Sequence, residues 1–144
     1  AYMLHRGLQT LDLRVRCAQE NATFLATQLS AHSKVLRVHH PSLNDPQSLI
    51  GRQMSGPGAL LAFEVEGGIQ AAGTVMAEVA LCTPAVSLGS VDTLIQHPAG
   101  LTHRNASAEA RRNSGIRDGL LRLSVGIEDA SDLWLDLSSA LSKI

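Results

Sequence analysis

An apolar stripe with a helical period runs from Leu8 to Leu29 and constrains the fold more than any other feature of the sequence. Apolar side chains recur along it at spacings of three and four residues: Leu8, Leu11, Val15, Ala18, Ala22, Leu25 and Leu29. Polar side chains such as Arg14 and Glu20 fall outside it. This spacing predicts an amphipathic α-helix of about six turns. The helix needs an apolar surface against which its stripe can be buried.

The residues before this stripe give a second expectation. Ala1 to Arg6 begin without an initiator Met and without a capping residue, and they have the composition of a helix interior. We therefore expect the chain to be a piece of a longer protein.

Four later segments, residues 35–39, 60–65, 83–88 and 120–127, have the alternation or the β-branched composition of strands. In the second, Leu61, Phe63 and Val65 share one face. In the last, one face carries Leu121, Leu123, Val125 and Ile127, and the other carries Leu120, Arg122, Ser124 and Gly126. The last segment is the strongest strand prediction.

Helical patterns separate these strands. We expect a short helix ending near Met54 and another within residues 108–112. A longer helix follows Gly67-Gly68, with Ile69, Ala72, Met76 and Val79 on its inner side. The last helix is capped by Asp129 and buries Leu133, Leu137 and Leu141.

Because strands and helices interleave and the strands are short, the fold class is α/β, of the α+β type. We expect a short mixed or antiparallel sheet with helices packed on one face. Neither a repeat nor a linker divides the chain, so residues 1–144 form a single domain.

The charge composition excludes several classes of partner. Twelve Lys and Arg stand against 13 Asp and Glu, for a net charge of −1, so we expect no nucleic-acid partner and no anionic membrane partner. No apolar run approaches the roughly 20 residues that span a bilayer. Cys17 and Cys82 lack the spacing of a zinc site or a disulfide framework, and His97 and His103 lack a third ligand. We expect a cytoplasmic protein without a metal site.

Arg122 is the residue that most needs an explanation. It lies between leucines on the strongest strand, and a buried guanidinium is costly unless an acceptor pairs with it. Two acceptors remain open at this point: an acidic side chain of the same chain, or the carboxylate of a ligand. Ser87, in Ser87-Leu88-Gly89, ends a strand where a hydroxyl and backbone N–H groups can meet an anion, although on these residues alone a simple turn is the better explanation.

Several blocks of sequence, in order, resemble one known family. They are Arg6-Gly7-Leu8-Gln9-Thr10-Leu11, Arg52-Gln53-Met54, Ala85-Val86-Ser87-Leu88-Gly89, Leu94-Ile95-Gln96-His97-Pro98-Ala99, Thr102-His103 and Leu121-Arg122-Leu123-Ser124-Val125-Gly126-Ile127-Glu128-Asp129. Together they resemble the C-terminal domain of the Cys/Met-metabolism enzymes that use pyridoxal phosphate. These include the cystathionine and methionine γ-lyases, cystathionine γ-synthase and the homoserine sulfhydrylases.

The resemblance implies a fold and a set of roles. The fold is the small C-terminal domain of a fold-type I pyridoxal-phosphate enzyme. Arg122 binds the α-carboxylate of a small sulfur amino acid, Ser87 helps to hold it, and Thr102 lies near the substrate. The resemblance also implies that the lysine that binds the cofactor covalently belongs to an upstream domain. Neither Lys34 nor Lys143 lies in a matched block. The resemblance also implies a partner, the chain's own cofactor domain, and a homo-oligomer, the family tetramer.

Val86 bears on the choice of activity within the family. Members that act on cystathionine commonly have Glu before this serine, so Val86 favours a methionine γ-lyase-like α,γ-elimination. The alternatives are a homoserine sulfhydrylase, a cystathionine γ-lyase or a cystathionine γ-synthase. An alternative of another class is a non-catalytic regulatory or oligomerisation module. In either case we expect the chain alone to be inactive.

Overall fold

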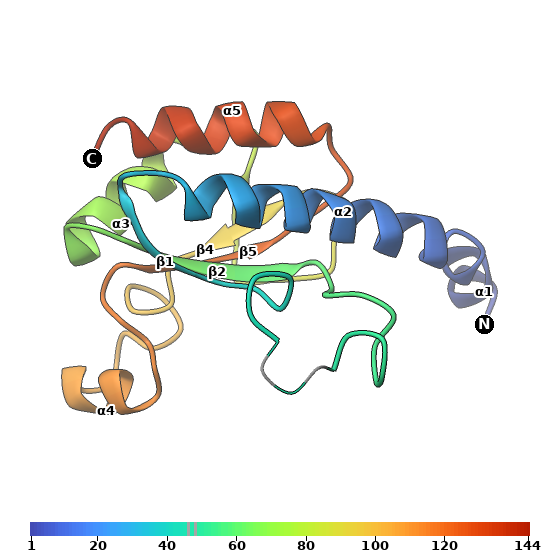
Figure 1. Cartoon of the computed structure of the whole chain (residues 1–144), viewed down its shortest axis with the longest axis horizontal. Helices are drawn as coiled ribbons and strands as arrows, with labels where there is room; N and C mark the ends of the chain where they lie inside the picture. Colours follow the sequence, from blue (N-terminus) through green and yellow to red (C-terminus); the bar gives the residue numbers. More distant parts are fainter. Residues whose placement is uncertain (46, 48) are drawn as a thin grey trace.

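A mixed five-stranded sheet forms the centre of the structure, a computed structural model that describes residues 1–45, 47 and 49–144 (Figure 1). The strands are β1 (Val35–His39), β2 (Leu60–Val65), β3 (Thr83–Pro84), β4 (Leu94–Gln96) and β5 (Leu120–Ser124). The helices are α1 (Tyr2–Leu8), α2 (Leu11–Ser30), α3 (Gly68–Glu78), α4 (Ala108–Asn113) and α5 (Ala130–Leu141). The strand order is β1-β2-β5-β4-β3, and every pair is antiparallel except β3 with β4.

Helices α2, α3 and α5 cover one face of the sheet and enclose the hydrophobic core (Figure 1). The sheet contributes Leu61, Phe63, Leu121 and Leu123, each at most 2% exposed, as their alternation predicted. Helix α5 buries Leu133, Leu137 and Leu141, and its first turn is capped by the Asp129 carboxylate, which accepts from the N–H groups of Ser131 and Asp132. The predicted fold class, with a sheet and helices on one face, is confirmed.

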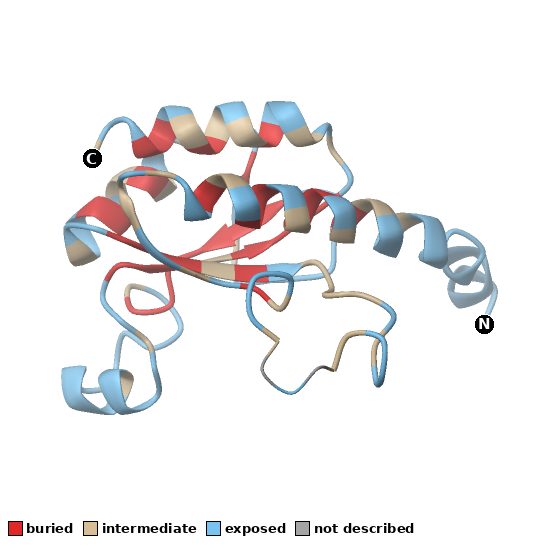
Figure 2. Cartoon of the chain, viewed as in Figure 1, coloured by how far each residue is buried: buried red, intermediate tan, exposed pale blue. Residues whose placement is uncertain are grey.

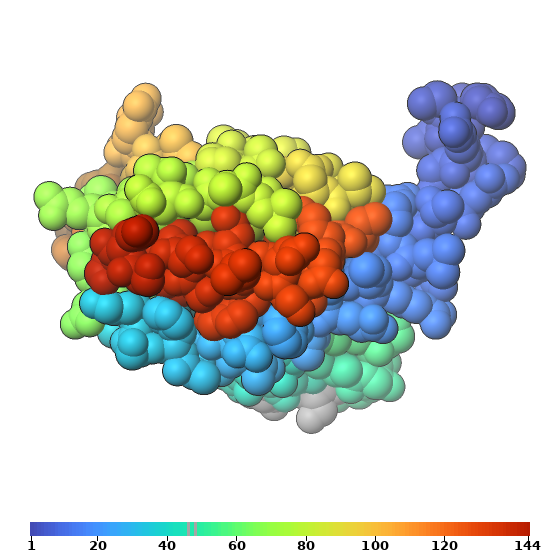
Figure 3. All heavy atoms as spheres, turned by 90° about the horizontal axis from the view of Figure 1, so that it is seen from above, coloured from blue at the N-terminus to red at the C-terminus, as the bar shows by residue number. Residues whose placement is uncertain are grey.

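The first helix differs from the prediction. The helical pattern is interrupted at Gln9 and Thr10, so α1 is separate and has no buried residue. Burial along α2 begins only at Ala18, whereas Leu11 and Val15 remain exposed. Figure 3 shows α1 standing away from the body of the molecule. The apolar stripe is therefore half covered by this chain and half open.

The four predicted strands were correct in position, and β1 and β2 also in length, but the other two are shorter than predicted. The strand expected at residues 83–88 contains only Thr83–Pro84, and β5 ends at Ser124 and not at residue 127. Beyond Ser124 the backbone turns to loops, where the N–H of Gly126 donates to Thr93 Oγ1 at 2.9 Å. A side chain at Gly126 would collide with the carbonyl oxygen of Val91, so this close approach requires glycine.

Three other local predictions were wrong or incomplete. Ile69, expected inside, is 50% exposed, and α3 buries the small residues Ala71 and Ala72 with Val75. Strand β4 was not predicted at all. Part of the short helix expected before Met54 lies outside the described residues, and residues 49–54 form turns with a single bridge between Ile50 and Met54.

The second face of the sheet is lined by loops, and α4 lies away from the sheet on this side (Figure 1). Figure 2 shows that burial is concentrated in the sheet and on the inner sides of the three long helices, whereas α1 and most of α4 are exposed. Polar side chains are nevertheless buried on this second face, among them Glu64, Gln96 and Ser124. In the part of the chain that the structure describes, no helix is long and apolar enough to cross a membrane.

Candidate functional site

A straight row of four residues crosses the second face of the sheet. His39 of β1 pairs with Ala62 of β2, Ala62 with Arg122 of β5, and Arg122 with Gln96 of β4. Neighbouring strands are about 4.8 Å apart, and side chains at paired positions point to the same face. The row therefore places Arg122 at the centre of the sheet, between the small side chain of Ala62 and the amide of Gln96.

The Arg122 guanidinium contacts the loop that carries two of the predicted site residues. Its Nη2 donates to the carbonyl oxygens of Ser87 at 2.7 Å and Val86 at 3.3 Å. The Nε of Arg122 is buried and has no hydrogen-bond partner among the described residues. The arginine thus reaches the predicted loop, but through backbone carbonyls and not through the Ser87 hydroxyl.

No carboxylate within the described residues lies within ion-pair distance of Arg122. Glu64, two residues from Ala62 on the same strand, is the buried acid of this face. Its Oε1 lies 2.9 Å from His39 Nε2 and its Oε2 lies 3.5 Å from Arg117 Nε. Since Glu64 contacts His39 and Arg117, Arg122 keeps a positive charge that no acidic side chain among the described residues of this face neutralises.

Strand β5 and the residues after it hold the 85–93 loop at three positions. Arg122 binds the carbonyls of Val86 and Ser87, and the hydroxyl of Ser124 accepts from the N–H of Gly89 at 2.8 Å. The Glu128 carboxylate accepts from Thr93, through the backbone N–H at 2.5 Å and the hydroxyl at 2.8 Å. These contacts fix Val86 and Ser87 relative to the guanidinium, although both residues are exposed in this chain.

Thr102 contacts the row of residues centred on Arg122 through Gln96. Gln96 is 2% exposed, and its Nε2 donates to Thr102 Oγ1 at 2.7 Å. Thr102 Oγ1 also lies 2.9 Å from His103 Nδ1. The structure thus brings Arg122, Val86, Ser87 and Thr102 to one region, the first three by direct contact and Thr102 through Gln96. The sequence interpretation did not single out Gln96, whose only signal is a polar side chain directly after two buried apolar ones.

Two other polar residues of this region are largely buried. His97 is 6% exposed and its Nε2 lies 2.8 Å from the carbonyl oxygen of Asp118. The side chain of Arg111 is 11% exposed, pairs with Asp118 at 2.9 Å and donates to the carbonyl of Ala106. Both residues fix the segment that leads into β5.

Three ionisable groups outside the row have displaced pKa values. Burial lowers the pKa of His40, partly offset by its contact with the carbonyl of Gly58. Burial, with the nearby Asp136 charge, raises the pKa of the Cys82 thiol. Burial acts to raise the pKa of Asp136, but it is outweighed by hydrogen bonds from the N–H groups of Cys82 and Ala80, and the pKa is lowered. These groups serve the fold, since Asp136 ties α5 to the segment between α3 and β3.

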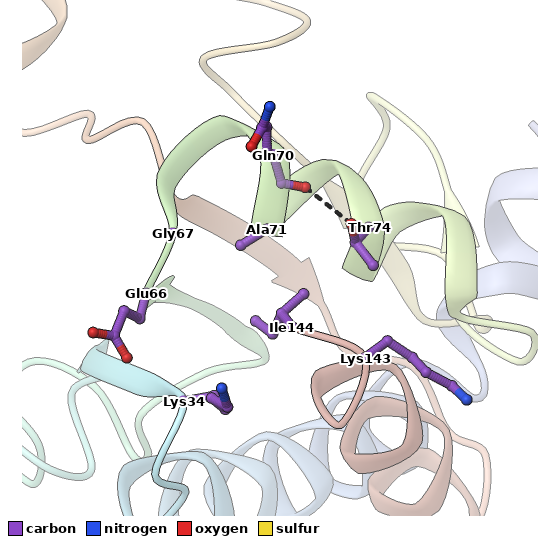
Figure 4. Close-up of a pocket in the computed structure, with 8 residues that line it drawn as sticks. All are labelled: Lys34, Glu66, Gly67, Gln70, Ala71, Thr74, Lys143 and Ile144. Atoms are coloured by element: carbon purple, nitrogen blue, oxygen red, sulfur yellow. Dashed lines mark hydrogen bonds between the residues drawn. The ribbon is translucent and has the colours of Figure 1, made fainter.

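The two lysines of the chain lie elsewhere. Both line a pocket beside the start of α3 and the end of the chain, together with Glu66, Gln70 and Ile144 (Figure 4). The pocket is open and its lining is mixed in charge. Among the described residues, no group of three His, Cys, Asp or Glu side chains is placed to hold a metal ion.

The sequence of this chain is similar to those of known proteins. A family model described as "Cys/Met metabolism PLP-dependent enzyme" matches residues 1–142. The L-methionine γ-lyase of Brevibacterium sandarakinum is 53% identical over 98% of this chain and 35% of its own length. The L-methionine γ-lyase of Streptomyces avermitilis is 51% identical over 97% of this chain and 30% of its own length.

Two solved structures of related enzymes have a similar fold. A cystathionine γ-lyase from Micromonospora echinospora superposes with a TM-score of 0.91 at 44% identity, covering 98% of this chain and 37% of that one. A cystathionine γ-synthase from Xanthomonas oryzae gives a TM-score of 0.87 at 47% identity, covering 96% and 36%. Both are fold-type I enzymes, and the chain spans about a third of the length of each relative. The chain belongs to the family of Cys/Met-metabolism enzymes that depend on pyridoxal phosphate.

Proposed function

We propose that this chain is the C-terminal, carboxylate-binding domain of a longer pyridoxal-phosphate enzyme that acts on a sulfur amino acid. One observation carries the proposal: Arg122 is half-buried, and its described partners are two carbonyls and no carboxylate. A buried arginine without an anion is costly. A planar guanidinium fits a carboxylate with two parallel hydrogen bonds. The α-carboxylate of an amino acid supplies that missing anion.

The residues of this chain do not fit the cofactor by themselves. Pyridoxal phosphate supplies the electron sink in enzymes of this family and is commonly held by a lysine. Lys34 and Lys143 line a pocket with Gln70 and Ile144, and neither belongs to the row centred on Arg122. We therefore assign cofactor binding to a domain outside this chain. The role of this chain is to fix the substrate carboxylate and so orient the bonds at the α-carbon.

A methionine γ-lyase-like α,γ-elimination, yielding a thiol, ammonia and a 2-oxo acid, is the activity that we favour. The apolar Val86 is held directly beside Arg122 by its carbonyl, where a charged side chain would instead meet the distal ammonium of cystathionine. The relatives of highest identity reported above are L-methionine γ-lyases. The second candidate is a cystathionine γ-synthase, γ-lyase or homoserine sulfhydrylase. It is favoured by a second structure of the Xanthomonas oryzae cystathionine γ-synthase, which was solved with cystathionine and is also 47% identical.

The open half of the apolar stripe supports docking of the cofactor domain. Leu8, Leu11 and Val15 are 42–64% exposed, and α1 adds Tyr2, Met3 and Leu4 at 73–76%. Leu11 and Val15 also line a hollow of 260 Å³ together with Leu60, Leu88 and Ile127. Exposed apolar surface of this kind marks an interaction site. We assign it to contacts within the complete enzyme, which we propose to be a cytoplasmic homo-oligomer whose other ligand is the sulfur amino acid. The alternative, a free-standing regulatory module, would have no cofactor domain upstream of Ala1.

Replacement of Arg122 tests this function. In the full-length enzyme, Arg122→Ala should lower kcat/KM by about 10- to several-hundred-fold, because a charge-assisted contact to the substrate is lost. Arg122→Lys should recover only part, since an ammonium lacks the planar fork. Arg16→Ala is the matched control, because Arg16 is exposed and pairs only with Asp12 on its own helix. A lowered melting temperature with unchanged kcat/KM would identify Arg122 as a structural residue and refute the proposal.

A further inference from the structure

Two buried polar atoms without partners belong to residues that face each other across the sheet. Among the described residues, Nε of Arg122 lacks an acceptor and Oε1 of Gln96 lacks a donor. Arg122 and Gln96 are directly paired positions of β5 and β4, so their side chains leave the same face about 5 Å apart at Cβ. One atom is an obligate donor and the other an obligate acceptor. Each is the partner that the other needs.

Neither atom is expected to remain unpaired. Buried polar groups in proteins are hydrogen-bonded in the great majority of cases, and an orphaned group carries its full desolvation penalty. The two side chains are flexible beyond Cβ, and a single water satisfies a donor and an acceptor that do not meet directly. A small adjustment of either side chain, or one water between them, would therefore satisfy both groups.

Thr102 sets the direction of the Gln96 amide. Its Oγ1 accepts from Gln96 Nε2 at 2.7 Å and lies 2.9 Å from His103 Nδ1. This arrangement commits the Nε2 end of Gln96 to Thr102 and leaves Oε1 for Arg122.

We propose that Gln96 is the positioning residue of Arg122. Its Oε1 accepts the Nε–H of the guanidinium, and Thr102 holds Gln96 in the orientation that allows this. With Nε held by Gln96, the end of the fork formed by Nη1 and Nη2 is left for the substrate carboxylate, with Nη2 shared between the carboxylate and the carbonyls of Val86 and Ser87. The inference rests on the proposed carboxylate-binding role of Arg122 and extends it to two residues that need not touch the substrate themselves.

The test separates substrate affinity from turnover in the full-length enzyme. Gln96→Met keeps the length of the side chain and removes both polar ends. We expect it to raise KM for methionine about 10-fold, with kcat changed less than about threefold, because a misaligned fork weakens ground-state binding and transition-state binding alike. Gln96→Asn keeps an amide acceptor and should recover part of this loss. Gln70→Met is the matched control, since Gln70 is exposed and lines the distant lysine pocket.

Two further measurements ask whether Gln96 acts through Arg122. In an Arg122→Ala background, Gln96→Met should have no further effect on KM, whereas independent contributions would add. 3-(Methylthio)propylamine is methionine without its carboxylate. Its inhibition constant should be unchanged by Gln96→Met. If Gln96→Met fails to fold, Thr102→Val removes the hydroxyl that orients the amide, and it should raise KM about two- to fivefold.

The outcomes distinguish this inference from the proposed function. If Arg122→Ala raises KM but Gln96→Met and Thr102→Val do not, the positioning role is refuted and the proposed function stands. If the effects of Arg122→Ala and Gln96→Met add, Gln96 acts independently and the inference is again wrong. If Arg122→Ala itself leaves KM and kcat/KM unchanged, the proposed function fails and the inference fails with it.

Discussion

The two faces of the sheet use the same strands for different purposes. On the helix-covered face, β5 presents Leu121 and Leu123, both 0% exposed, to an aliphatic core. On the opposite face the alternate residues are Arg122 and Ser124, which hold the 85–93 loop. Alternation along one strand thus separates residues that stabilise the fold from residues that organise the site. Mutations on the two faces should therefore differ in kind as well as in magnitude.

The largest effect is expected on the helix-covered face. Leu123→Ala should lower the free energy of unfolding by about 2–5 kcal/mol, because it removes buried methyl groups and leaves a cavity. Thermal or urea unfolding of the 144-residue chain measures this. Leu135→Ala is the control, since Leu135 is 65% exposed and its truncation should cost less than about 0.5 kcal/mol. Equal costs at the two positions would show that Leu123 is not in a packed core.

A smaller effect is expected where α5 is tied to the rest of that layer. The Asp136 carboxylate accepts from the N–H groups of Ala80 at 2.7 Å and Cys82 at 2.9 Å. Asp136→Asn keeps the shape but loses the charge and one acceptor, and should destabilise the chain by about 1–3 kcal/mol at neutral pH.

The pH dependence of that cost sharpens the prediction. Because the pKa of Asp136 is lower in the folded chain, its contribution is fully present above the ordinary value of about 4 and is lost as the pH falls through the folded pKa. The stability difference between the original chain and Asp136→Asn should therefore shrink on acidification below about pH 4. A difference that grows on acidification would contradict the assignment.

The smallest effect is expected at the exposed edge of the site. In the full-length enzyme, Val86→Glu should raise activity on cystathionine relative to methionine by about fivefold. The reason is that an exposed pairing with the distal ammonium contributes only up to about 1 kcal/mol. Val86 is 56% exposed, so the substitution should leave the melting temperature unchanged. Competition between the two substrates measures the ratio, and an original enzyme that already prefers cystathionine would reverse our choice of activity.

The sequence predicted the elements in which apolar residues repeat regularly over several residues. The faces of β2 and β5 and the buried side of α5 follow from alternation or from helical spacing over 5 to 12 residues. Strand β4 has three residues, all buried, so neither period can be recognised in it. The length of β3 depends on where its neighbour β4 ends, which is a tertiary constraint. The interruption at Gln9 and Thr10 left no signal, since both residues are compatible with a helix.

For the site, single residues could be predicted but their connections could not. Arg122 could be predicted because a guanidinium between two leucines requires a hydrogen-bond acceptor. Gln96 was not, because its importance comes from its pairing with Arg122 across β4 and β5, a register that no local pattern encodes. Glu64 and His39 were missed for the same reason, since 25 residues separate them in the chain.

The last strand of the chain is the middle strand of the sheet, and this order has a consequence for synthesis. Among the described residues, β5 is the strand that joins the β1-β2 pair to the β3-β4 pair in the sheet. A nascent chain that has not yet released Leu120–Ser124 from the ribosome can therefore form a two-stranded ribbon but not the complete sheet. Pairing β2 with β5 also closes a loop of more than 50 residues, a type of contact that forms slowly. Until that moment the apolar side of α2 has no complete surface against which to pack, so a ribosome stalled before residue 120 should leave a chain that depends on chaperones.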